Sequence, residues 1–480
     1  MSVRVRIAPS PTGELHIGSV RTFFYNLLFA LQRSGEMVLR VEDTDQERLV
    51  AGAIDSIYDG LHWLGITWTE GPREGGPHAP YVQSERLPLY QRHARQLVEA
   101  GAAYYCFCSK ERLAELRRQQ EARHELTRYD RRCRSIPPAE AAERAKTEPH
   151  VVRLKVPDEG TLAIDDLVHG HVEWRADTIE DQIILKSDGF PTYHLAVVVD
   201  DQIMAITHII RGEEWLPSVP KHLLIYRAFG WQVPPMAHVP SVLAPDGHKL
   251  SKRHGATAVS EFRAQGYIPE ALINYLALVG WSPGTEEEVF SLEDLIRKWK
   301  IEQVQTAGGK WDKERLDFFN GVWIRRLSVE ELVRRLDPFV PREWDRSLLR
   351  KVTPLIQERM KTLAEAKDQI AFLFTDDLRY DHALLVPKKR DAASTVEALA
   401  RATVPLRFAE PFTAPVIRLA IEGVAGELGW TTRELTIALR IAVTGRTIGP
   451  PLYESIELLG REKTLARIER AQELLAGGGD

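Results

Sequence analysis

The 480-residue sequence has few cysteines and no long apolar run, and each absence excludes a class of protein. With only 3 cysteines the chain cannot build a disulfide framework, which is typical of proteins kept in a reducing compartment. No run of about 18 apolar residues occurs, so we expect no transmembrane helix. Residues 1–6 lack the apolar segment of a secretory signal peptide. The sequence therefore predicts a cytoplasmic protein outside the membrane.

The composition that is present describes a folded chain of several domains. Hydrophobic residues make up 44% and charged residues 27% of the sequence, which suits globular folding. The length indicates about two to four domains. A net charge of −5 does not favour a nucleic-acid partner, but such binding can use a local patch. Residues 110–134 carry nine Lys or Arg and five Asp or Glu, which fits either such a patch or a solvated helix face.

The first 45 residues have the pattern of a parallel α/β fold. Apolar and basic residues alternate over 3–7, which predicts a short strand. The loop at 8–13 contains two prolines and a glycine, and helical periodicity follows over 19–33. A second strand is predicted at 37–41, ending in the acidic cluster 42–45. Strand, loop, helix and strand in this order open a parallel sheet.

The remaining sequence predicts mixed and then helical structure. Residues 51–105 have a largely helical pattern, and strand-like runs occur at 151–156 and 183–185. The apolar run Leu195–Val199 predicts another buried strand. Beyond about residue 256 helical periodicity prevails, with a break near residue 340 at two prolines and a terminal glycine-rich tail expected to fray.

Two short segments suggest phosphate chemistry. Residues 9–19 lie between the first strand and the first helix and contain Gly13, His16 and Gly18, which suits close approach of a phosphate to a helix N-terminus. This segment is neither a Walker loop nor a dinucleotide fingerprint. Residues 248–255 place lysines, an arginine and histidines before a glycine, which suits a loop closing on a polyphosphate. Either segment alone is more readily explained as a turn than as a site.

Taken together, the segments resemble the two signature motifs of class I aminoacyl-tRNA synthetases, here His16-Ile17-Gly18-Ser19 and Lys249-Leu250-Ser251-Lys252-Arg253. Further segments at 40–45, 188–196 and 211–215 narrow the resemblance to bacterial-type glutamyl-tRNA synthetases, over almost the whole chain. The resemblance implies a Rossmann-like catalytic domain with an α+β insertion, followed by an all-helical anticodon-binding region. It divides the chain into a first catalytic half (1–105), an acceptor-end-binding insertion (106–190), a second catalytic half (191–255), a connecting helical region (256–325) and an anticodon-binding domain (326–480).

The resemblance also implies site residues. For glutamate these are Arg6, Ser10, Glu42, Tyr193, Val197 and Arg211. For ATP they are Ser10, His16, Gly18, Glu214, Val242, Lys249, Leu250, Ser251, Lys252 and Arg253. His16, Lys249 and Lys252 are the implied catalytic residues, because they can stabilise charge on the phosphates. The residue types fit a substrate with two carboxylates and one ammonium, since arginines bind carboxylates and a glutamate pairs with an ammonium.

Three departures from the family pattern matter. Ser19 replaces the second histidine of the first motif, so only His16 carries a catalytic role there. Val197 stands where some members have asparagine, so no polar side-chain contact is expected at that position. In the second motif, Leu250 and Arg253 replace the usual methionine and serine, which preserves the cations.

The cysteines suggest a metal site. Three thiolates, Cys106, Cys108 and Cys133, could hold zinc tetrahedrally with a fourth ligand. Ser135 occupies the position of the family's histidine ligand, which leaves Tyr129 and His124 as candidates, Tyr129 by resemblance to a tRNA-modifying branch of the family. The alternative is a set of buried cysteines without metal.

The implied activity is ATP-dependent glutamylation of the glutamate tRNA by a monomer, with Mg²⁺ accompanying ATP. Two related alternatives are a glutamyl-queuosine tRNA ligase, which lacks a helical anticodon domain, and a glutaminyl-tRNA synthetase, whose distal domains are β-barrels. The helical periodicity after residue 325 argues against both. A catalytically silent tRNA-binding paralogue is a third alternative, which the presence of Arg6, Glu42, Lys249 and Lys252 disfavours.

Overall fold

The structure, a computed structural model, describes residues 2–477 and divides into two compact units. Unit 1 comprises residues 1–262 and 272–313, and unit 2 comprises 263–271 and 314–480. Among the described residues, no helix combines the length and apolar character needed to cross a membrane. The predicted tail at 477–480 falls, apart from Gly477, outside the described residues.

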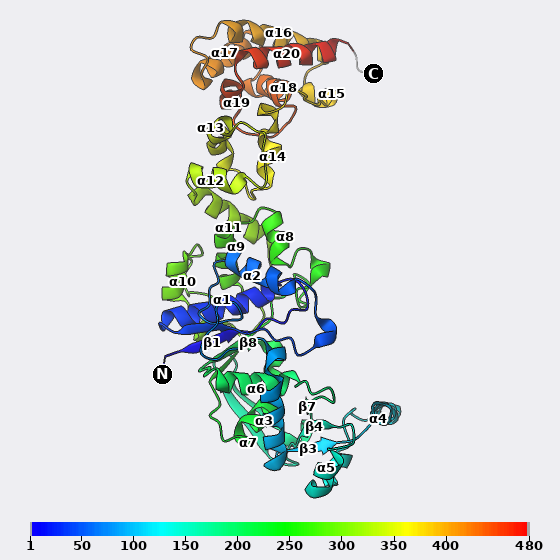
Figure 1. Cartoon of the computed structure of the whole chain (residues 1–480). Helices are drawn as coiled ribbons and strands as arrows, with labels where there is room; N and C mark the ends of the chain where they lie inside the picture. Colours follow the sequence, from blue (N-terminus) through cyan, green and yellow to red (C-terminus); the bar gives the residue numbers. More distant parts are fainter. Residues whose placement is uncertain (1, 478–480) are drawn as a thin grey trace. The chain divides into compact units, whose positions relative to one another are not determined.

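Unit 1 has an α/β centre made of two parallel strand pairs. The first pair is β1 (Arg4–Ile7) with β2 (Glu36–Leu39), and the second is β8 (Ile209–Gly212) with β9 (Met236–Val239). Backbone hydrogen bonds from Thr207 and His208 to the carbonyl of Arg4 join the two pairs. Helix α1 (Ile17–Gln32) packs against β1, β2 and β8, and Figure 1 shows it beside β1 and β8. This arrangement is the predicted opening of a parallel α/β fold.

A second, antiparallel part of unit 1 lies between these strand pairs in sequence. It contains a three-stranded sheet of β3 (Ala103–Cys106), β4 (Val151–Leu154) and β7 (Ile183–Leu185), and a hairpin of β5 (Thr161–Asp166) and β6 (Gly170–Arg175). The other helices that lie wholly in unit 1 are α2 (Ala53–Trp63), α3 (Leu87–Glu99), α4 (Lys110–Ala122), α5 (Pro138–Arg144), α6 (Tyr193–Ile203), α7 (Val219–Ala228) and α10 (Leu292–Lys298).

One predicted element is wrong. The run Leu195–Val199 is not a strand but the centre of α6. All five of its residues are buried, as are Asp200 and Asp201 after them. A helix buried on every side has no polar face, so its sequence lacks the period that separates a helix from a buried strand.

Unit 2 is helical around one apolar core. Three helices, α8 (Val259–Ala264), α9 (Pro269–Leu278) and α11 (Lys313–Arg326), contain the points where the chain passes from one unit to the other. The others are α12 (Val329–Leu336), α13 (Arg346–Gln357), α14 (Glu365–Ile370), α15 (His382–Leu385), α16 (Ala392–Phe408), α17 (Ala414–Glu427), α18 (Thr432–Thr444), α19 (Leu452–Leu459) and α20 (Arg461–Ala476). The predicted break near residue 340 lies between α12 and α13.

Candidate functional site

A cavity of about 640 Å³ opens in unit 1, where the parallel strands end. Its walls come from the residues after β1, from the start of α1, from the ends of β8 and β9, and from the loop at 241–252. Ligands commonly bind parallel α/β folds at the carboxyl ends of the strands. The predicted residues that line it are Arg6, Ser10, His16, Gly18, Glu42, Tyr193, Arg211, Glu214, Val242, Lys249, Leu250, Ser251 and Lys252.

Two predicted site residues lie outside the cavity lining. Val197 is 1% exposed and packs in the apolar core around α6. Arg253 is exposed, directly after Lys252 in a short 3-10 helix. Neither is among the residues whose atoms form the cavity wall.

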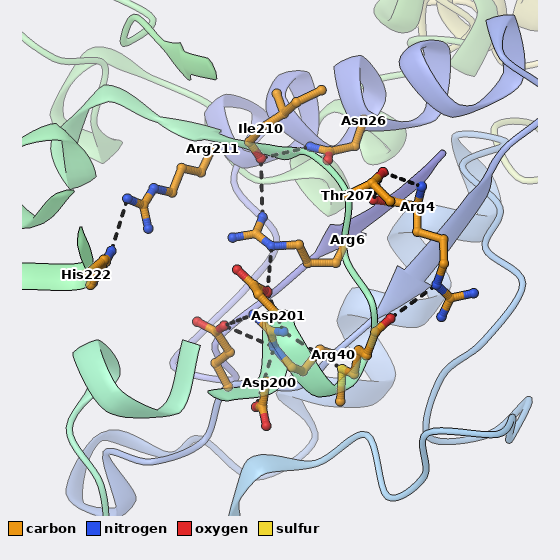
Figure 2. Close-up of polar contacts among 12 residues, drawn as sticks. Arg4, Arg6, Asn26, Arg40, Asp200, Asp201, Thr207, Ile210, Arg211 and His222 are labelled. Carbon is orange, nitrogen blue, oxygen red and sulfur yellow. Dashed lines mark hydrogen bonds and ion pairs between the residues drawn. The ribbon is translucent and has the colours of Figure 1, made fainter. Parts of the chain in front are cut away.

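A buried ion-pair network lies below the cavity. Asp201 on α6 accepts hydrogen bonds from Arg6 at 3.1 Å and from Arg40 at 2.7 Å, and Figure 2 shows both arginines converging on it. Arg40 also donates to Glu42 at 2.9 Å. Burial alone would raise the pKa of the Asp201 carboxyl, but Arg6 and Arg40 hold that pKa below its usual value. The network fixes Arg6 and Glu42 before any ligand arrives.

Asp200 anchors the same network to the surrounding helices. Its carboxylate accepts from Arg86 at 2.9 Å, Gln83 at 2.9 Å and the Tyr90 hydroxyl at 2.8 Å. Asp200 is 0% exposed, and each lone pair of a carboxylate removed from water needs a partner of this kind. Helix α6 is therefore tied through Asp200 to α3 and to the segment before it.

Glu42 is a largely buried carboxylate of the cavity lining. Burial raises its pKa, and the nearby Arg40 guanidinium only partly offsets this effect. An additional cation close to Glu42, beyond Arg40 and Arg6, would favour the ionised form further. The position is therefore suited to an incoming ammonium group.

Arg211, at the end of β8, lies beside two aromatic rings. Its Nη1 donates to the Tyr193 hydroxyl at 3.0 Å. The Tyr193 ring stacks on Trp215 with centroids 3.8 Å apart. Because the stack fixes the phenol ring, the hydroxyl and the guanidinium hold each other at the cavity wall.

His16 occupies the N-cap of α1. Its Nδ1 accepts a hydrogen bond from the Gly18 backbone N–H at 3.0 Å. Burial, assisted by the nearby Lys249 cation, lowers the pKa of the imidazole, so the ring is neutral near pH 7. A neutral ring that accepts at Nδ1 carries its proton on Nε2, so His16 can donate one hydrogen bond from that nitrogen.

Residues 248–255, here called the basic loop, are held by backbone hydrogen bonds where they leave the preceding segment. Leu250 N donates to Val242 O at 2.9 Å, and Ala244 N donates to His248 O at 2.7 Å. Lys249 forms an ion pair with Glu214 at 3.6 Å in which both side chains are about half exposed. Such an exposed pair is weak, so an anionic ligand can compete for the lysine.

The three cysteines meet in the antiparallel part of unit 1. The Sγ atoms of Cys106, Cys108 and Cys133 all lie within 4.8 Å of one another. The Tyr129 hydroxyl is 3.4 Å from the Cys106 sulfur and 3.5 Å from the Cys108 sulfur. Tyr129 is buried, whereas His124, the other candidate ligand, is exposed on the loop after α4.

Sequence reasoning did not single out several residues that support the site: Asp166, Asp200, Asp201, His222, His238 and Trp215. The pair Asp200–Asp201 carried one usable signal, because two carboxylates directly after an apolar run must find buried cations. Trp215 belongs to the segment 211–215 that carries the family resemblance. Asp166, His222 and His238 give no such signal.

Comparisons with known proteins match the whole chain. The family described as "tRNA synthetases class I (E and Q), catalytic domain" matches residues 2–318, and the "Anticodon binding domain" matches residues 331–472. A curated "Glutamate--tRNA ligase" of Dehalococcoides mccartyi is 45% identical over 98% of this chain and 97% of its own length. The protein of the same name from Moorella thermoacetica is 44% identical, covering 98% of each chain.

A solved structure agrees with these sequence matches. A crystal structure of a glutamate tRNA ligase from Elizabethkingia meningosepticum, in complex with its amino acid, superposes with a TM-score of 0.90 at 34% identity. It covers 99% of this chain and 100% of that chain. The similarity therefore extends across both units.

Proposed function

Because the chain belongs to the glutamate–tRNA ligase family of class I synthetases, we propose that it joins L-glutamate to the 3′-terminal adenosine of the glutamate tRNA. In the first step the α-carboxylate of glutamate attacks the α-phosphate of ATP, and pyrophosphate leaves. In the second step a ribose hydroxyl of the tRNA attacks the glutamyl carbonyl, and AMP leaves. Mg²⁺ enters as part of the MgATP substrate. The enzyme works in the cytoplasm as a monomer.

The observation that carries the proposal is that one cavity contains both sets of residues. One set has charges that suit the carboxylates and ammonium of glutamate, and the other has cations and donors that suit phosphate. Arg6 and Arg211 bind the two carboxylates of the substrate, and Glu42 binds its ammonium. Ser10 and Tyr193 supply hydroxyls. These residues lie on the same cavity wall as His16 and the basic loop, so the attacking carboxylate and the α-phosphate meet within it.

The phosphate end of the cavity supplies electrostatic stabilisation. His16 donates its Nε2 proton as a hydrogen bond to a phosphate oxygen, and a neutral ring does this without becoming charged. Lys249 and Lys252 neutralise the charge that develops on pyrophosphate. Ser251 and Arg253 add further donors, Gly18 lets a phosphate approach the start of α1 closely, and Glu214 holds Lys249 until ATP arrives. The buried side chains of Val242 and Leu250 form apolar wall beside the nucleotide.

Each predicted segment has a task in this scheme. Residues 1–105 and 191–255 carry the chemistry, and the insertion at 106–190 holds the acceptor end of the tRNA. Residues 256–325 connect to 326–480, which bind the anticodon. Helical unit 2 supports this assignment over the shorter base-modifying ligase and over the enzyme with distal β-barrels.

The cysteine cluster fits a structural zinc ion, which we include in the proposal. Tetrahedral zinc with Zn–S bonds of about 2.3 Å places its sulfurs roughly 3.8 Å apart. Cys108 and Cys133 lie 3.5 Å apart, and the Tyr129 hydroxyl reaches two of the sulfurs. When bound, zinc would cross-link β3 to the short 3-10 helix Arg132–Ser135, which contains Cys133. Metal analysis of the purified protein should give about one zinc per chain, lost in Cys133→Ser.

The testing experiment is aminoacylation of purified glutamate and glutamine tRNAs with radiolabelled glutamate, ATP and Mg²⁺. Charging of the glutamate tRNA alone indicates a discriminating enzyme, and charging of both indicates a non-discriminating one. Both outcomes support the proposal. Glutamate transferred to an anticodon base, without charging of any 3′ end, would favour the base-modifying alternative. Lack of activity with every tRNA would leave the tRNA-binding paralogue.

A further inference from the structure

The guanidinium of Arg211 is surrounded by three hydrogen-bond acceptors, none of which is a carboxylate. Its Nε donates to His238 Nε2 at 3.0 Å, its Nη2 lies 3.3 Å from His222 Nδ1, and its Nη1 donates to the Tyr193 hydroxyl. Figure 2 shows Arg211 extended toward His222. Arg211 is 5% exposed, His222 1% and His238 0%. Two buried imidazoles thus hold the arginine that faces the cavity.

The proton positions on both rings follow from these contacts. His238 Nδ1 lies 2.6 Å from the Asp166 carboxylate, so this nitrogen carries the proton and Nε2 is free to accept from Arg211. Because a guanidinium can only donate, His222 accepts from Arg211 at Nδ1 and carries its own proton on Nε2. His222 Nε2 donates this proton to His194 Nδ1 at 3.2 Å. Burial lowers the pKa of His238 to about 4. Burial and the nearby Arg211 cation lower the pKa of His222 well below its usual value, so both rings are neutral near pH 7.

Asp166 is itself fixed by the backbone. Its Oδ1 accepts from the N–H groups of Val168 at 2.9 Å, His169 at 3.0 Å and His238 at 3.3 Å. Asp166 is the last residue of β5, so the hairpin of the antiparallel part reaches the wall behind the cavity. The chain of contacts runs from this hairpin through His238 to Arg211.

Within residues 2–477, two N–H groups of Arg211 have no hydrogen-bond acceptor. A guanidinium has five N–H donors, and three of them point to His238, His222 and Tyr193. One donor therefore stays on each terminal nitrogen, which is the pair that a carboxylate accepts bidentately. Arg6 differs, because Asp201 pairs with it directly.

We propose that Asp166, His238 and His222 are positioning residues that orient Arg211 for one carboxylate of glutamate while leaving its charge unpaired by a direct carboxylate contact. This inference rests on the proposed function and deepens it. Asp166 selects the tautomer of His238, and the two neutral imidazoles then accept from Arg211 without neutralising it. The Asp166 carboxylate therefore acts on the Arg211 guanidinium only through the His238 ring.

The test compares the KM for glutamate with the KM for ATP, in aminoacylation with the cognate tRNA, for four full-length variants. His238→Phe keeps the ring volume but removes the acceptor, and we expect the KM for glutamate to rise about tenfold to a hundredfold with the KM for ATP unchanged. His238→Gln keeps an acceptor toward Arg211 and a donor toward Asp166, so it should stay within about threefold of the native KM. His93→Gln is the matched control, since His93 is a buried histidine of unit 1 whose one hydrogen bond within the described part of the chain goes to the Leu89 carbonyl.

Asp166→Asn gives the most specific test, because it preserves the size of the side chain and changes only which nitrogen of His238 carries the proton. With its oxygen kept on the backbone N–H groups, the amide N–H₂ faces His238 Nδ1 and moves the ring proton to Nε2, against the Arg211 Nε–H. We expect the same rise in the KM for glutamate as in His238→Phe. The nitrogen NMR shifts of His238 should change from the Nδ1–H to the Nε2–H tautomer.

Several outcomes would overturn the inference. One is a native KM for glutamate in both His238→Phe and Asp166→Asn. Another is an equal loss in His93→Gln, or a parallel rise in the KM for ATP, either of which would indicate a general folding effect. A native enzyme without glutamylation activity would overturn the proposed function and this inference together. Native charging with unaffected variants would overturn the inference alone.

Discussion

The interiors of the two units differ in what they bury. Unit 1 encloses fully buried charges around its cavity, among them Arg6, Arg40, Asp200, Asp201 and Arg211, each no more than 5% exposed. The core cluster of unit 2 is aliphatic and aromatic, and its buried Arg467 donates to backbone carbonyls rather than to a carboxylate. The buried hydroxyls of Thr353, Thr395 and Ser455 bond to the carbonyl four residues earlier.

The difference shows what a reaction site requires of a fold. Buried ion pairs such as Arg40–Asp201 are costly to desolvate, and well-packed apolar residues would often give equal or greater stability. Unit 1 keeps them because they place charges before the substrate binds. Unit 2 needs only a rigid helical framework, which apolar packing provides.

The largest expected effect comes from removing the shared carboxylate of unit 1. Asp201→Ala leaves Arg6 and Arg40 without their common partner, and we expect a loss of about 3–5 kcal/mol in the free energy of unfolding of unit 1. Hydrogen exchange of the full chain should show faster exchange throughout unit 1 and native protection in unit 2. Similar protection in both units of the variant would contradict the importance of this network.

The next largest loss in the free energy of unfolding should come from truncating a buried apolar side chain in unit 2. Leu439 on α18 is 0% exposed, and Leu439→Ala should cost about 3 kcal/mol through lost burial and the cavity left behind. The KM values for glutamate and ATP should not change, because no residue of the cavity in unit 1 is altered. Leu439→Met is the control of conserved volume, expected to cost less than about 1.5 kcal/mol. A raised KM for glutamate in Leu439→Ala would break the separation between the units.

Local pattern predicts much of this architecture, and most of the site residues that the motif resemblance implies line the cavity. The strands around Arg6 and Glu42 follow from alternation and from acidic residues at a strand end, and the parallel fold brings both residues to one edge. Motif resemblance added Tyr193 and Arg211, which line the same cavity. Their chemical roles stay predictions.

Long-range partners could not be predicted in the same way. Asp166 and His238 are 72 residues apart and meet only because β5 ends beside β9. Nothing near either residue indicates the other. The run Leu195–Val199 was wrongly assigned to a strand for a related reason, since tertiary burial on every side removed the helical period.

Acid should weaken unit 1 before unit 2. Burial lowers the pKa of His238 to about 4, so between pH about 6.5 and 4 the unfolded chain binds a proton that the folded chain does not. Stability should therefore fall across this window, by about 1–3 kcal/mol for His238, and then level off below it. The sequence of unit 2 contains one histidine, His382, against 14 in the rest of the chain. Hydrogen exchange of each unit, measured during thermal unfolding at pH 7, 5.5 and 4.5, tests this order. His238→Gln should reduce the loss of stability of unit 1 on acidification.

The smallest expected effect is that of a polar residue at the surface of unit 2. Thr431 is the N-cap of α18 and accepts from the Glu434 backbone N–H at 3.2 Å, while the Glu434 carboxylate bonds back to Thr431. Thr431→Ala should lower the free energy of unfolding by about 1 kcal/mol, because the Glu434 N–H loses its side-chain acceptor. The loss is small because this N–H is exposed and can bond to water instead. Thr431→Ser keeps the acceptor and should be close to native in denaturant unfolding. If Thr431→Ala proved as damaging as Asp201→Ala, the contrast between a charge-bearing and an apolar interior would not explain where polar substitutions are costly.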